Sequence, residues 1–100
     1  MSYDYYYVLD DDGNPKEEPD IIKWGVWFGA TERHIGEDKI GDVMVSTVFL
    51  GLNHNFGTGE PVLWETMIFG GVHDEYQERY FSKDDAMVGH RKAVELVRGL

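Results

Sequence analysis

Side chains that can bind a ligand gather in one short segment, residues 51–61. Five of them offer hydrogen-bonding groups or a stacking face: Asn53, His54, Asn55, Phe56 and Thr58. The three glycines of this segment allow a ligand to approach the backbone closely. The segment has no phosphate-loop lysine and matches no glycine-rich fingerprint. It is therefore either a ligand-binding loop or a long hairpin loop whose histidine caps the backbone.

Four further candidates lie outside this segment: Trp64, Glu65, Arg79 and His90. Glu65 is an acid among apolar neighbours on a predicted strand, which indicates either a functional group with a perturbed pKa or a paired one. Arg79 follows on the next predicted strand, so the register of the intervening hairpin predicts a structural Glu65–Arg79 pair. Trp64 offers a stacking face. His90 falls on the apolar side of the last predicted helix, where a histidine is more typical of the core than of a ligand site.

Catalytic and metal-binding patterns are absent from the sequence. The chain has no cysteine, which excludes disulfides, thiol catalysis and thiolate metal sites. No serine sits in a nucleophile elbow, and no two histidines have the spacing that binds metal on a helix. The acidic run at residues 10–14 lacks the glycine position and final glutamate of a calcium loop and predicts a hairpin turn instead. We therefore predict no catalytic residue, no metal and no cofactor, and rank a metal-dependent enzyme last.

The chain is strongly acidic, with 19 acidic residues against 9 basic ones and a net charge of −10. Such a field repels nucleic-acid phosphate and anionic membranes and favours encounter with a basic protein surface. Solubility alone is the alternative explanation of the charge. The first residues lack the pattern of a signal peptide, and no apolar run approaches the roughly 20 residues that span a bilayer. These features and the missing cysteines predict a cytoplasmic protein.

Hydrophobic periodicity predicts a single α+β domain over residues 1–100, a length typical of one core. The predicted antiparallel meander has four strands, at about 33–40, 43–51, 62–69 and 76–81. A helix is predicted near 19–30, where a strand is the alternative, with Pro19 in its first turn. A capping sequence at Ser82 predicts the C-terminal helix, residues 84–98.

Both faces of the two central strands are apolar, whereas a half-exposed antiparallel sheet has one polar face. Met44 and Val48 alternate with Val45 and Phe49 on the first strand, and the second strand repeats the pattern. Either the two helices cover opposite faces, or one face meets another chain. The second alternative predicts a homo-oligomer, most simply a dimer.

A long stretch of the sequence resembles a family of small bacteriophage and prophage proteins without an assigned activity. The resemblance rests on residues 45–57 and 60–71, which contain VSTVFLGLNH and WETMIFGG, on Arg79-Tyr80, on residues 86–90, and on the turn at 12–15. It covers most of residues 43–98. Where the family often has aspartate before the histidine, this chain has Asn53, so no acid–base or metal role is carried over to that position. The resemblance implies a phage gene expressed in a host cell.

Taken together, these features predict a small, acidic, phage-encoded protein that binds a host protein without catalysing a reaction, of the host-takeover or anti-defence type. The alternative is a binder that sequesters a nucleotide or another small ligand, with the 51–61 loop placed at an oligomer interface.

Overall fold

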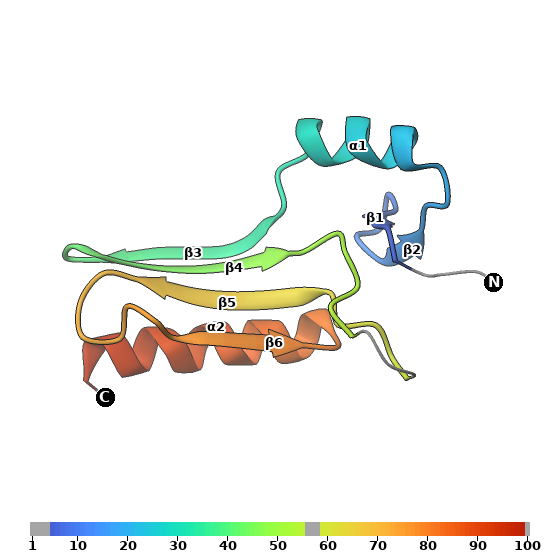
Figure 1. The fold of residues 1–100 in the computed structure, drawn as a ribbon. Coiled ribbons are helices and arrows are strands. Elements are labelled where there is room, and N and C mark those ends of the chain that lie inside the picture. Colours follow the sequence, from blue (N-terminus) through green and yellow to red (C-terminus); the bar gives the residue numbers. More distant parts are fainter. Residues whose placement is uncertain (1–4, 56–58, 100) are drawn as a thin grey trace.

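The computed structural model describes residues 5–55 and 59–99, and its main body is a four-stranded antiparallel sheet with a long helix on one face (Figure 1). The chain runs through β1 (Tyr7–Leu9), β2 (Pro15–Glu17), α1 (Ile21–Ala30), β3 (His34–Ile40), β4 (Val43–Phe49), β5 (Trp64–Phe69), β6 (Gln77–Tyr80) and α2 (Lys83–Arg98). The predicted α+β class, the four-stranded meander and both helices are confirmed. The hairpin turn predicted at residues 10–14 is confirmed, because it joins β1 to β2. The strand β2 itself was not predicted.

The sheet follows the simplest order, β3-β4-β5-β6, because each strand returns beside the one before it. Between β3 and β4, Ile40 pairs with Val43 across a two-residue turn, and Gly41 takes the positive φ of +60° that such a turn requires. Gly70 ends β5 at a φ of +91°, and a Cβ there would lie 2.9 Å from the carbonyl oxygen of Asp42. These glycines fix the register that decides which side chains share a face.

Helix α2 covers one face of this sheet and forms the core with it. Its buried side comprises Ala86, Gly89, His90 and Ala93. Towards its start lies a cluster that includes Phe49 and Trp64, and towards its end lies a second cluster. The second cluster contains Val45, Ile68 and Ala93. The predicted capping serine is confirmed, since Ser82 Oγ accepts a hydrogen bond from the backbone N–H of Asp85.

Helix α1 lies at one end of the sheet, beside β1, rather than over a face (Figure 1). Asp20 caps its start by accepting bonds from the N–H groups of residues 22 and 23. Pro19 therefore precedes the helix, and the prediction that it sits in the first turn is wrong. The indole N–H of Trp24 donates to the carbonyls of Tyr7 (3.1 Å) and Gly51 (3.0 Å), which ties the helix to β1 and to the segment after β4.

The opposite face of the sheet carries no helix of the described chain, so the alternative in which the two helices cover opposite faces is wrong. We call this the open face. Its side chains are those of His34, Glu37, Lys39, Met44, Ser46, Val48, Glu65, Met67, Phe69, Gln77 and Arg79. Neither described helix is long and apolar enough to cross a membrane.

Candidate functional site

A buried carboxylate lies on the open face, held by two neighbours on the edge strand. Glu65 is only 7% exposed. Its Oε2 accepts hydrogen bonds from Arg79 Nε at 2.9 Å and from Gln77 Nε2 at 2.7 Å. Glu65 and Arg79 are direct cross-strand partners, so the predicted pair is confirmed. The charge of Glu65 is thus neutralised by a partner whose own side chain is 41% exposed.

His54 lies near this pair and is influenced by both of its charges. Partial burial lowers the pKa of His54, the positive charge of Arg79 lowers it further, and the negative charge of Glu65 opposes the shift. The backbone N–H of His54 donates to the carbonyl of Val62 at 2.9 Å, which anchors the segment beside β5. The structure thus brings together three of the predicted site residues: His54, Glu65 and Arg79.

The two asparagines beside His54 hold their own loop together. Asn53 Oδ1 accepts bonds from the N–H groups of Asn55 (2.8 Å) and Val62 (3.0 Å). Asn55 Nδ2 donates to the carbonyl of Glu60 at 2.9 Å. These contacts are those of a structured hairpin loop. Phe56 and Thr58, the other predicted residues of this loop, lie outside the described residues.

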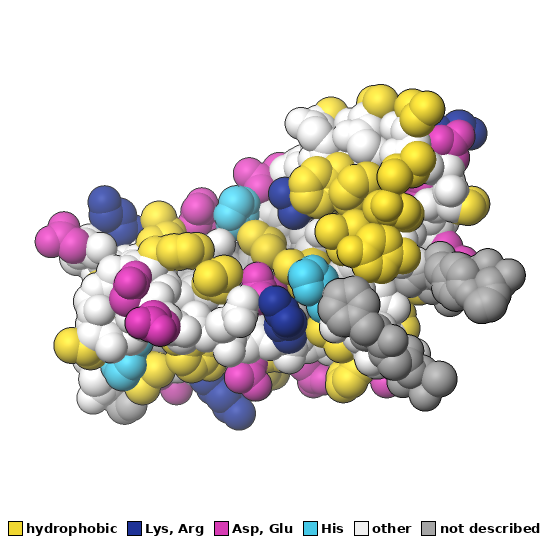
Figure 2. Space-filling model, in the orientation of Figure 1, with side chains coloured by type: hydrophobic (Ala, Val, Ile, Leu, Met, Phe, Trp, Pro, Cys, Tyr) yellow, Lys and Arg dark blue, Asp and Glu magenta, His cyan; other side chains and the backbone are white. Residues whose placement is uncertain are grey.

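Apolar side chains extend along β4 and β5 from the buried pair on the open face, which Figure 2 views directly. Met44 and Phe69 are cross-strand partners, and Val48 stands opposite Glu65 itself. Met67 lies between them on β5, and Phe69 is 46% exposed. Charged and polar residues of the two edge strands border this apolar centre: Glu37, Lys39, Gln77 and Arg79.

The remaining two predicted site residues lie on the covered face, away from the others. Trp64 is 1% exposed and stacks at a tilt against Phe49, with ring centroids 4.9 Å apart. Its ring therefore fills the core instead of meeting a ligand. His90 points from α2 into the sheet, where Nδ1 lies 2.7 Å from Thr47 Oγ1 and Nε2 lies 2.7 Å from Asp38 Oδ2.

Asp38, His90 and Thr47 form a carboxylate–imidazole–hydroxyl chain, the arrangement that activates a nucleophile in hydrolases. Here Thr47 is 0% exposed and also bonds Thr66 Oγ1 at 2.6 Å, so no substrate reaches its hydroxyl. In the neutral tautomer with the proton on Nε2, the imidazole donates to Asp38 and Nδ1 accepts from Thr47, so both ring nitrogens of His90 have partners. The arrangement forms a polar layer between the two apolar clusters beneath α2.

Two glycines allow close packing here, Gly36 between β3 and the imidazole of His90 and Gly89 between α2 and Tyr80 of β6. A Cβ on Gly36 would lie 2.9 Å from the imidazole of His90, and a Cβ on Gly89 would overlap the ring of Tyr80. The sequence offered one sign of this layer, since Thr47 and Thr66 are hydroxyl residues on two adjacent strands. The contact of Asp38 with His90 could not be predicted, because the two residues are 52 positions apart in the sequence.

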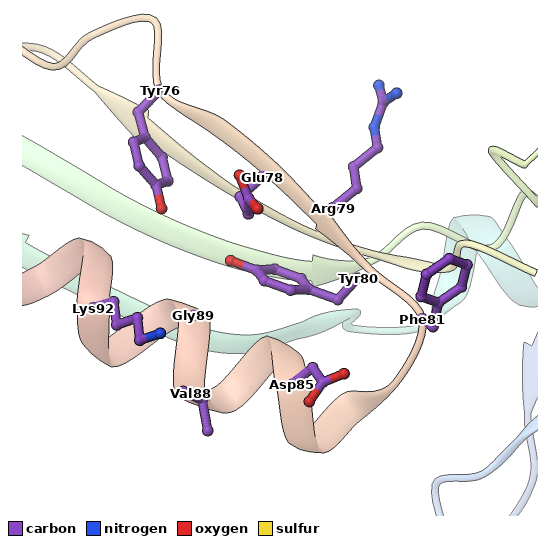
Figure 3. Close-up of a pocket in the computed structure, with 9 residues that line it drawn as sticks. All are labelled: Tyr76, Glu78, Arg79, Tyr80, Phe81, Asp85, Val88, Gly89 and Lys92. Atoms are coloured by element: carbon purple, nitrogen blue, oxygen red, sulfur yellow. The ribbon is translucent and has the colours of Figure 1, made fainter.

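A groove of about 400 Å³ runs between β6 and α2 (Figure 3). Tyr76 and Tyr80 extend from the strand towards the helix, whereas Arg79 extends away from the groove. Glu78, Asp85 and Lys92 give it mixed charge. Nothing in its lining selects one ligand, so it is secondary to the open face.

No group of three or more histidine, aspartate or glutamate side chains among residues 5–55 and 59–99 could hold a metal ion. Comparison of the chain with protein-family models, curated proteins and solved structures finds no match in any of the three. The functional argument therefore rests on the geometry of the described residues.

Proposed function

We propose that this chain is a non-enzymatic protein-binding domain of bacteriophage type, which engages a host protein through the open face of its sheet. The observation that carries the proposal is the composition of this face. Met44, Val48, Met67 and Phe69 provide four apolar side chains on β4 and β5, with Ser46 and Glu65 among them, and no described helix covers them.

The layout of the open face matches the anatomy of a protein interface, with an apolar core inside a polar rim. Methionine is favoured on binding surfaces because its flexible thioether adapts to a partner's shape. Two of the four methionines of the chain, Met44 and Met67, lie here. Beside them, Glu65 and Arg79 form an ion pair within the chain, so these two charges are fixed in position before a partner binds.

The net charge of −10 supports a partner with a basic surface. Long-range attraction raises the rate of encounter, and salt weakens it because mobile ions screen the charges. Salt sensitivity therefore separates this kind of binding from purely apolar adhesion.

The test is capture from a bacterial host lysate by the immobilised chain, with Met67→Arg as the disruptive variant and Met87→Arg as the matched control. Met87 lies on α2, on the other side of the molecule, and is 37% exposed, so the same substitution can be made there. We expect wild type and M87R to retain a partner that M67R loses by about tenfold or more, as a central interface residue should. We also expect the complex to dissociate in about 0.5 M NaCl, where the Debye length is only about 4 Å.

Two results would contradict the proposal: equal capture by the M67R and M87R variants, or capture that is indifferent to salt. Thermal unfolding of both variants shows beforehand that each is folded.

A further inference from the structure

Strand β6 is one edge of the main sheet, and no described strand pairs with its outer side. The carbonyl of Tyr76, just before β6, accepts a hydrogen bond from the N–H of Ile68 at 3.3 Å, so it faces β5. Successive residues of a strand direct their backbone groups to opposite sides. The N–H and C=O groups of Gln77 and Arg79 therefore point away from the sheet, where a further strand can bind them.

The other edge of the sheet, β3, is protected against strand pairing, whereas β6 is not. The register of β3 against β4 is irregular between His34 and Gly36, and Lys39 lies on the same strand. Irregular registers and lysines are common protections of an exposed edge. Strand β6 contains neither lysine nor proline and pairs with β5 in a continuous register. It is therefore the edge that can accept an additional strand.

The groove between β6 and α2 lies beside this edge and has a volume of about 400 Å³. Tyr76, Glu78 and Tyr80 extend from the strand towards the helix (Figure 3). A strand added to β6 would direct every second side chain to the same side of the sheet, over the groove. The lining alone selects no ligand, but the edge adds backbone hydrogen bonds to a space for alternate side chains. Recognition by strand addition uses these two elements.

The charges around the groove favour a basic side chain. Arg79 extends away from the groove and is paired with Glu65. Two carboxylates, Glu78 and Asp85, then lie opposite the single ammonium group of Lys92, and none of the three forms an ion pair with another described side chain. A lysine or arginine can lay its aliphatic part along the tyrosine rings while its charged end reaches a carboxylate.

A second copy of the chain does not fit this edge. Two chains of net charge −10 repel each other. In the two-fold antiparallel pairing that would use Gln77 and Arg79 of both copies, Glu78 faces Glu78, and like charges directly opposite are destabilising. A lipid surface offers no backbone groups in the register of a strand. An extended basic segment of another protein satisfies both the edge and the charge.

We propose that β6 binds an extended basic segment of the partner protein as an additional strand, whose alternate lysine or arginine side chains enter the groove beside α2. The inference rests on the proposed function, because the same partner supplies the segment. Gln77 and Arg79 border the open face, so the added strand would continue the surface that the partner already contacts.

The probe is a synthetic peptide of about eight residues in which lysine alternates with threonine, a residue that favours strands. The control peptide alternates glutamate with threonine. We expect the lysine peptide to shift the amide NMR signals of Gln77 and Arg79 in the full chain, with a dissociation constant in the millimolar range. At about ten times this concentration, hydrogen exchange of the two amides should slow by about tenfold. The amide of Glu78 faces β5 and should change little.

Gln77→Pro tests the edge itself. Gln77 is the first residue of β6 and its N–H is not used by β5, so proline is tolerated there but removes the outward donor. Gln77→Ala is the matched control, because both variants lose the side-chain bond to Glu65. We expect Q77P to weaken binding of the lysine peptide by about tenfold, and Q77A to bind it as wild type does. A lysine peptide with methylated backbone nitrogens, which cannot donate to the edge, should not bind wild type.

Three results would overturn the proposal: unchanged signals of Gln77 and Arg79 at about 10 mM lysine peptide, equal binding of the glutamate peptide, or equal binding by Q77P and Q77A. These results are separate from the capture test of the open face. Loss of the host protein by M67R, with no peptide bound at β6, would leave the open face and remove the added strand. Peptide binding at β6, with equal capture by M67R and M87R, would do the reverse.

Discussion

Gly89→Ala tests how α2 packs on the sheet, because it should destabilise the fold although alanine has a higher helix propensity than glycine. In an open helix, replacing glycine with alanine stabilises by about 1 kcal/mol. At Gly89 the new Cβ would overlap the hydroxyl and ring of Tyr80. The ring is rigid and half-buried between β6 and α2, so it cannot swing aside without moving the strand or the helix.

Overpacking of this kind costs about 1–3 kcal/mol. After the gain in propensity, we expect a net loss of up to about 2 kcal/mol in the free energy of unfolding. For a chain of this length a loss of about 2 kcal/mol lowers the melting temperature by roughly 8–16 °C.

The control is the same substitution in the other helix, at Gly25 of α1. A Cβ there meets nothing within 4 Å, so Gly25→Ala should stabilise by about 0.5–1 kcal/mol. Calorimetry measures both variants. An increase in melting temperature for both would refute the described docking of α2 against β6.

Three further predictions concern the buried polar groups. Thr47→Val keeps the shape of the side chain but leaves His90 Nδ1 buried without a partner, so we expect a loss of about 1–3 kcal/mol in urea unfolding. Arg79→Ala should destabilise more than Glu65→Leu, because the first leaves a buried carboxylate with one remaining partner whereas the second removes the charge; equal losses in the two variants would contradict the pairing. His54 should titrate below 6.5 by NMR, because burial lowers its pKa. A histidine whose pKa is lowered by folding contributes stability above pH 6.5 and loses that stability as the pH falls through its folded pKa. The melting temperature of wild type should therefore fall more on acidification than that of His54→Gln.

The strands were predictable because local signals decide them. Residues 43–49 and 64–69 are rich in β-branched and aromatic side chains, and glycine turns at residues 41–42 and 70–71 join these two strands to their outer neighbours. The same register predicted the Glu65–Arg79 contact. The capping serine and an apolar side that includes His90 predict helix α2.

The positions of the helices depend on contacts distant in sequence, and these were not predictable. Both faces of β4 and β5 are apolar, so alternation alone does not indicate which one α2 covers. The sequence therefore predicts Trp64 as a ligand-stacking side chain, whereas its ring fills the core. The spacing of Trp24 and Phe28 predicted a packed side of α1. Its place at the end of the sheet depends on carbonyl groups of Tyr7 and Gly51, far along the chain.

The central claim is that the open face of the sheet is the surface that binds a partner protein. Methionine methyl NMR tests it most directly, because Met44 and Met67 report on the open face while Met87 reports on the outer side of α2. On titration with the host protein recovered by capture, we predict that the signals of Met44 and Met67 shift or broaden while that of Met87 stays in place. Perturbation of Met87 with unchanged signals from Met44 and Met67 would contradict the account.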